Sequence, residues 1–149
     1  MKILLEHWRS FLLEERTEYQ GILKVGLGPM ALSKAEALQS MLPEKAQRLD
    51  PEDLHVTLIH QSILKPLQKQ LEKLDLPAAP SVALEDKVWE RESLGKKSWV
   101  VRVKNQDKMR EYVKNIMELL GSENTSPEPE RVFHVSLANL TGNPHDSVR

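Results

Sequence analysis

Two tetrapeptides of one form stand in the two halves of this chain, HVTL at 55–58 and HVSL at 134–137. Each places a hydroxyl two residues after an imidazole. Histidine has an ordinary pKa of about 6.5, so it can accept or donate a proton near neutral pH. One histidine can therefore activate an attacking oxygen while the other protonates a leaving oxygen, and the hydroxyls can bind the non-bridging oxygens of a phosphate. The combination suits cleavage of a phosphodiester and requires no metal ion.

Both tetrapeptides lie in segments whose residues alternate between apolar and polar, which is typical of a half-buried strand. In segment 53–60 the leucines and the valine share one face, and His55 and Thr57 share the other. Segment 131–140 follows the same pattern. If both strands belong to one sheet, four polar side chains converge, and these are the candidate catalytic residues: His55, Thr57, His134 and Ser136.

The elements that must position these residues follow from periodicity and capping. In chain order we expect an amphipathic helix over 3–15, a strand over 21–28, one or two helices over 32–49 with Ser33 as a cap, a strand over 53–60, a helix over 66–76, strands over 82–90 and 96–104, a helix over 105–121 and a strand over 131–140. No linker divides this order, so it predicts a single α+β domain spanning 1–149.

Composition limits the partners and the compartment. The 149 residues are 40% hydrophobic, enough for a real core. A formal net charge of -1 gives no general attraction for polyanions, so phosphate recognition must depend on local groups. The absence of cysteine excludes disulfides and thiolate metal sites. With neither a signal peptide nor a long apolar run, we expect a cytoplasmic protein without a membrane partner.

Strand parity also sorts the residues that surround the site. Trp89 falls on the polar face of its strand, where it is either a platform for a nucleobase or a cap on the sheet edge, whereas Trp99 belongs to the core. Tyr19 is a weaker second platform, and Asn139 and Thr141 follow the second motif at the rim of the expected cleft. Most nearby basic residues are solvated surface by default, with one or two able to meet a phosphate: Lys87, Arg91, Lys96, Lys97 and Arg102.

The paired H-φ-[ST]-φ tetrapeptides resemble the signature of the 2H phosphoesterase superfamily, which includes cyclic phosphodiesterases and 2′-5′ RNA ligase-like proteins. The resemblance implies a bilobal α+β fold whose two pseudo-two-fold halves flank a central cleft. It also implies a metal-independent hydrolase without a cofactor, in which the two histidines and two hydroxyls are catalytic. The serine in the second motif replaces a threonine, which the family pattern permits. A zinc site fits less well, because two distant histidines without a carboxylate or cysteine pattern do not form a recognised one.

A narrower resemblance rests on three stretches, EHWRSFL, RESLGKKSWV and SLANLTGNP. They are similar to bacteriophage members of the superfamily, among them the anti-CBASS nucleases that degrade cyclic oligonucleotide messengers of bacterial defence. The expected activity is then cleavage of 3′-5′ phosphodiester bonds in a ligand such as cyclic GMP-AMP, in the host bacterial cytoplasm. With such a small ligand, we expect the protein to bind neither long nucleic acid nor an obligate protein partner.

Two alternative functions remain open. The first is an RNA-end processing enzyme, either a 2′,3′-cyclic phosphodiesterase or a 2′-5′ RNA ligase-like protein. The second is a protein that sequesters a cyclic nucleotide without turnover. Intact histidines in both motifs favour an enzyme, because a pure binder does not need a paired proton donor and acceptor.

Overall fold

A computed structural model describes residues 17–19, 22–121 and 132–148. The elements in chain order are β1 (Thr17–Tyr19), β2 (Leu23–Gly26), α2 (Pro29–Gln39), β3 (Gln47–Arg48), η1 (Pro51–Asp53), β4 (His55–Ile59), α3 (Gln61–Leu64), η2 (Lys65–Leu67), α4 (Gln68–Glu72), β5 (Leu84–Ser93), β6 (Lys96–Val103), α5 (Gln106–Leu119), β7 (His134–Asn139) and η3 (Pro144–Asp146). Helices and strands thus alternate along the chain, and the predicted α+β class is confirmed.

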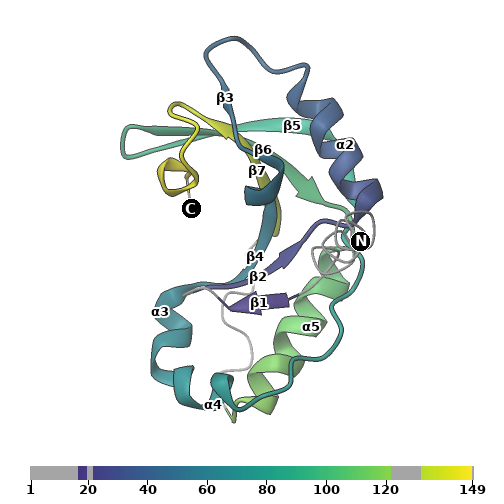
Figure 1. Ribbon diagram of the computed structural model, residues 1–149, viewed down its shortest axis with the longest axis vertical. Coiled ribbons are helices and arrows are strands. Elements are labelled where there is room, and N and C mark those ends of the chain that lie inside the picture. Colours follow the sequence, from purple (N-terminus) through teal and green to yellow (C-terminus); the bar gives the residue numbers. More distant parts are fainter. Residues whose placement is uncertain (1–16, 20–21, 122–131, 149) are drawn as a thin grey trace, which may run out of the picture.

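A single antiparallel sheet organises these elements, with the strand order β1-β2-β4-β7-β6-β5 and with β3 beside the end of β7. Figure 1 shows this sheet running from β5 to β1 along the long axis of the molecule. On each side of the central pair, β4 and β7, the chain follows the same order of hairpin, helix and strand. The first half uses β1, β2, α2 and β4, and the second uses β5, β6, α5 and β7.

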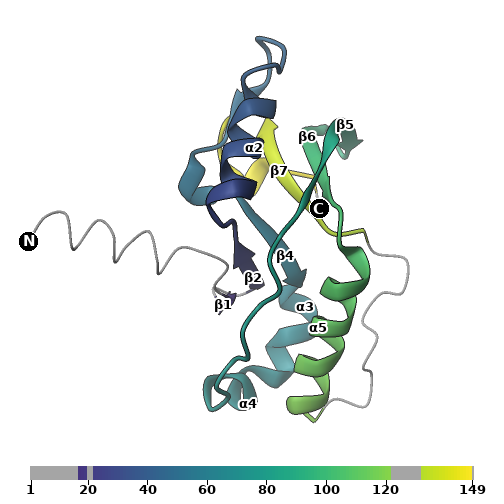
Figure 2. The ribbon, with the colours of Figure 1, turned by 90° about the vertical axis from the view of Figure 1, so that its right-hand side faces the viewer.

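The two long helices lie on the same side of the sheet (Figure 2). Helix α2 makes its main sheet contacts with β5 and β7, whereas α5 contacts β4. Each helix therefore packs on strands of the half to which it does not belong. The buried stripe of α5, which includes Met109, Val113 and Ile116, joins a core that also contains Val56 and Val135 from the central strands. One core thus unites both halves.

The region after β2 differs from the sequence-based expectation. Helix α2 begins at Pro29, with Gly28 in the capping position, so the prediction of Ser33 as a cap is wrong. The fixed φ of proline suits the first helical turn, which explains the earlier start. Residues 43–49, expected to be helical, instead make a turn and then β3, whose backbone pairs with β7. The hydrogen bonds to β7 replace those that a helix would have formed within the segment.

Other differences are smaller. The helix expected over 66–76 begins earlier, at Gln61, and is divided into three short pieces around Pro66. The strands β5 and β6 and the helix α5 match their predictions, and Gly121 ends α5 with a φ of 74°. The helix predicted over 3–15 lies outside the described residues. In the part of the chain that the structure describes, no helix is long and apolar enough to span a bilayer.

Candidate functional site

The site is built on the central strand pair, where β4 and β7 meet at Val56 and Val135. Both valines are fully buried. Because side chains alternate along a strand, the neighbours of each valine point to the other face of the sheet. These neighbours are all half-buried, and we call them the histidine face: His55 and Thr57 from β4, and His134 and Ser136 from β7. The predicted alternation is therefore confirmed for both motifs.

The register brings the two motifs together in a crossed arrangement. Counting outward from the valine pair, His55 lies opposite Ser136, and Thr57 lies opposite His134. Directly opposite residues of antiparallel strands have Cα atoms about 4.5–5.5 Å apart. Each imidazole thus neighbours the hydroxyl of the other motif, so both motifs contribute to one site.

Both imidazoles are oriented by the same backbone contact. His55 Nδ1 lies 2.7 Å from the carbonyl oxygen of Asp53, and His134 Nδ1 lies 3.2 Å from that of Val132. A carbonyl oxygen only accepts hydrogen bonds, so each Nδ1 carries the proton and donates it. In the neutral ring this leaves the lone pair on Nε2. Sequence reasoning did not anticipate this contact, which recurs two residues before each histidine.

The electrostatic surroundings favour the neutral form of His55. Burial lowers the pKa of His55, and the charge of Lys24 lowers it further, against opposing effects of the Asp53 carbonyl and carboxylate. Lys24 lies on β2, opposite Thr57, and therefore belongs to the same side of the sheet. Sequence reasoning missed Lys24. The signal was available, because it is the single charged residue in the otherwise apolar stretch 21–28.

Trp89 lies on the predicted side of the sheet but already has two cationic neighbours. It pairs with Val100 of β6, which in turn pairs with Ser136, so the three residues share a face. Lys87 Nζ lies 3.7 Å from the centroid of the indole ring, and Arg102 Cζ lies 4.0 Å from it. Nucleobase stacking on Trp89 stays a prediction, and a stacked base would share the ring with these cations. Trp99 is 1% exposed, which confirms its place in the core.

A bulge at Leu137 interrupts the alternation of side chains along β7 and changes the face of the sheet on which Asn139 lies. Strand β6 pairs with β7 at Val100 and Ser136, and again at Ser98 and Asn139, which leaves Leu137 as an extra residue. The shift puts Asn139 on the side of the histidine face, where it is fully buried.

The amide of Asn139 supports the turn that follows it. Nδ2 donates to the carbonyl oxygen of Asn143 and to Ser147 Oγ, and Oδ1 accepts from the backbone of Thr141 and Gly142. Asn139 therefore holds the C-terminal turn and does not line an open rim, contrary to the expectation. Thr141 is exposed, and its hydroxyl donates to Asp146 at 2.7 Å.

The C-terminal turn closes one end of this side of the sheet. The backbone N–H of Val148 donates to Ser98 Oγ at 2.7 Å, which fixes Val148 over β6. Figure 1 shows the C-terminal segment on the side of the sheet away from α2 and α5. At the other edge, Tyr19 ends β1, which pairs with β2 and so is two strands away from β4. A role for Tyr19 stays a prediction.

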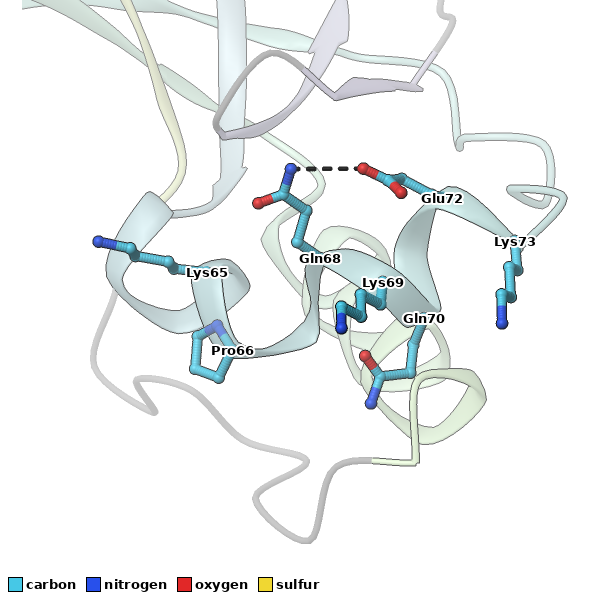
Figure 3. A pocket seen from close by; sticks show the side chains of 7 residues that line it. All are labelled: Lys65, Pro66, Gln68, Lys69, Gln70, Glu72 and Lys73. Atoms are coloured by element: carbon cyan, nitrogen blue, oxygen red, sulfur yellow. Dashed lines mark hydrogen bonds between the residues drawn. The ribbon is translucent and has the colours of Figure 1, made fainter.

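A separate hollow of about 790 Å³ lies along η2 and α4 (Figure 3). Its lining residues are all exposed and come from one short segment: Lys65, Pro66, Gln68, Lys69, Gln70, Glu72 and Lys73. The hollow contains none of the predicted site residues. Among residues 17–19, 22–121 and 132–148, no group of three or more histidines and carboxylates is arranged to hold a metal ion. The histidine face is therefore the candidate site.

Comparisons of the chain with protein-family models, with curated proteins and with solved structures give no significant match.

Proposed function

We propose that this protein is a metal-independent phosphodiesterase of the 2H phosphoesterase type, with a bilobal arrangement of its two halves. The observation that carries the proposal is the pairing of β4 with β7. It puts both histidines and both hydroxyls on one side of the sheet, with each imidazole held by a backbone carbonyl. Two imidazoles in one small area match the need of phosphodiester cleavage for one base and one acid.

His55 is assigned the role of the base. Its pKa is lowered by burial and by Lys24, so the ring is neutral at neutral pH, and its Nδ1 proton is bound to the Asp53 carbonyl oxygen. The lone pair on Nε2 then accepts the proton of the attacking oxygen, either a ribose 2′-hydroxyl or a water. The new bond between this oxygen and phosphorus forms as the proton leaves.

His134 is assigned the role of the acid. As the bond between phosphorus and the 5′-oxygen breaks, the imidazolium of His134 gives its proton to the departing oxygen. Thr57 and Ser136 are the nearest hydroxyls by register and hold the non-bridging oxygens, whose negative charge increases in the transition state. The positive charge of Lys24 beside His55 favours the same anionic group.

The proposed substrate is a cyclic di- or trinucleotide with 3′-5′ linkages, such as cyclic GMP-AMP, and the proposed role is to counter a CBASS defence in a bacterial host. The net charge of -1 favours a small ligand, because proteins that bind long nucleic acid usually carry a strong basic surface. The resemblance of three stretches of the chain to bacteriophage anti-CBASS nucleases supports the same class.

The test is turnover of a panel that contains cyclic dinucleotides, linear dinucleotides and RNA ending in a 2′,3′-cyclic phosphate, each with a chelator present. We expect a cyclic dinucleotide to be consumed fastest. Faster consumption of the RNA would replace this function by RNA-end processing. Tight binding of a cyclic dinucleotide without cleavage of any member would replace it by sequestration.

A further inference from the structure

We propose that Lys87 and Arg102, gathered on the ring of Trp89, bind a second phosphate group of the substrate, beyond the phosphate that the histidines cleave. The inference rests on the proposed function, because it assigns a further contact to the same substrate. It predicts that the preferred substrate contains at least two phosphodiesters.

We call Lys87, Trp89 and Arg102 the Trp89 cluster. It adjoins the histidines on the same side of the sheet. Arg102 of β6 is the register partner of His134, and Trp89 lies on β5, the next strand outward. Neighbouring strands are about 4.8 Å apart, so the backbone of the cluster is roughly 5–10 Å from the strand of His134. A substrate held at the histidines therefore extends over Lys87 and Arg102 if it continues towards β5.

The charges of the cluster lack a counterion in the described chain. Lys87 Nζ and Arg102 Cζ both lie within 4.0 Å of the ring centroid, and neither makes an ion pair with a carboxylate of the described residues. Lys34 and Lys97, by contrast, pair with carboxylates. Two neighbouring positive charges repel each other, and the indole ring offsets only part of that repulsion. A phosphate would complete the balance.

The backbone of β5 is irregular in the segment that carries Lys87. Its register with β6 shifts between Leu84 and Val88, and Lys87 lies within this irregular segment. Bulges of this kind bend a strand and re-aim a side chain, and they occur often beside active sites. From this segment Lys87 contacts the same indole ring that Arg102 contacts from β6.

The position of Arg102 points to a second phosphate and not to the reacting one. Its guanidinium contacts a ring that belongs to β5, so its charge is drawn away from the β4–β7 pair. On the other flank of the β4–β7 pair, Lys24 of β2 lies on the same face of the sheet, and its charge acts directly on His55. Lys24 is therefore the cation beside the reacting phosphate, and the Trp89 cluster is available for another one.

The experiment compares two probes with the same bases, 3′,3′-cyclic GMP-AMP with two phosphodiesters and linear GpA with one. The variants are Lys87→Met and Arg102→Met, singly and together, each of which removes the charge and keeps an unbranched apolar side chain. Trp89→Leu removes the ring that gathers the cations, and Trp89→Phe keeps a ring. Lys108→Met is the matched control, because Lys108 is exposed on α5, across the sheet from the histidine face.

We expect each methionine variant to lower kcat/KM for the cyclic probe by about tenfold more than for GpA, since a charge-assisted hydrogen bond is lost only with the second phosphate. Trp89→Leu should match the double variant, and Trp89→Phe and Lys108→Met should resemble the wild type. Equal losses on both probes, or no loss, would overturn the inference.

Failure of the proposed function would be recognised separately. If the wild-type protein cleaves neither probe, titration calorimetry of cyclic GMP-AMP with the wild type and with Lys87→Met/Arg102→Met decides the matter. Weaker binding by the double variant supports the second phosphate site even without turnover. Equal binding, or no binding to either protein, contradicts it.

Discussion

Each motif histidine donates its Nδ1 proton to the carbonyl oxygen two residues before it, so the segment that leads into each strand also fixes the tautomer of the imidazole. This arrangement differs from triads in which an aspartate orients the base. It also makes the two histidines alike in geometry, so that the assignment of base and acid depends on their electrostatic surroundings.

The charge of Lys24 should be visible in the pH dependence of activity. Burial and Lys24 lower the pKa of His55, so kcat/KM should fall on the acid side only as the pH drops below the ordinary value of about 6.5. Lys24→Met removes the positive neighbour and should move this fall to higher pH. The measurement is kcat/KM from about pH 5 to pH 8, with Lys108→Met as the control. If kcat/KM falls at the same pH in Lys24→Met as in the wild type, the account is contradicted.

The same pKa should affect stability. Because the pKa of His55 is lower in the folded state than in the unfolded state, the unfolded chain binds more protons in the interval between the two values. This contribution to stability is complete above about pH 6.5 and is lost as the pH falls through the folded pKa. We therefore expect the free energy of unfolding to decline less between pH 7 and pH 5 in His55→Gln. Parallel declines in urea titrations of both proteins would refute this linkage.

Among the elements, the bulge in β7 depends on α2. Gln39 is buried, and its amide donates to the carbonyl oxygen of Leu49 at 3.0 Å and to that of Leu137, the bulged residue, at 2.9 Å. Gln39→Leu leaves these carbonyls with fewer donors and should lower the free energy of unfolding by about 1–3 kcal/mol. Gln68→Leu, at an exposed position of α4, should change it by less than about 0.5 kcal/mol. Equal effects of the two substitutions in urea unfolding would show that Gln39 does not hold the bulge.

The C-terminal turn offers a second test at this scale. The buried amide of Asn139 bonds four groups of the turn, so Asn139→Ala should lower the free energy of unfolding by about 1–3 kcal/mol. Thr141→Ala removes an exposed hydroxyl and should have the smaller effect. Chemical unfolding of both variants provides the comparison. A larger effect of Thr141→Ala would mean that the exposed hydroxyl of Thr141, and not the buried amide of Asn139, stabilises the turn.

The elements also show which features a sequence can predict. Alternation along 53–60 and 131–140 predicted both central strands and the face of each histidine, because one buried side of a strand imposes a period of two. The sequence did not predict that β4 and β7 are adjacent, and the convergence of the four site residues was expected only if they were. Pairing between distant segments leaves no local signal. The bulge at Leu137 was not predicted for a related reason, because the groups that donate to its carbonyl oxygen, on Gln39 and Leu49, are distant in the sequence. Residues 43–49 were misjudged because pairing with β7 outweighed their helical propensity.

Across the whole molecule, the exchange of helices between the halves links the site to the core. Helix α2 packs on β5 and β7, and α5 packs on β4, so neither half completes its core alone. The separation of the two histidines is therefore fixed by packing from both halves. Charge is distributed unevenly on the same scale. The net charge is -1, yet Lys24 and Arg102 flank the two motif strands in the strand order. A small phosphodiester fits this local concentration of positive charge.

The central claim is that the two histidines carry out proton transfer without a metal ion. The most direct measurement is kcat on the preferred cyclic dinucleotide, with EDTA present, for the wild type, His55→Ala and His134→Ala, together with circular dichroism to confirm folding. The account predicts that the wild type keeps its activity in EDTA, and that each substitution lowers kcat by about 10²–10⁴-fold in a folded protein. Near wild-type kcat in either folded variant, or loss of wild-type activity in EDTA with rescue by a divalent ion, would contradict it.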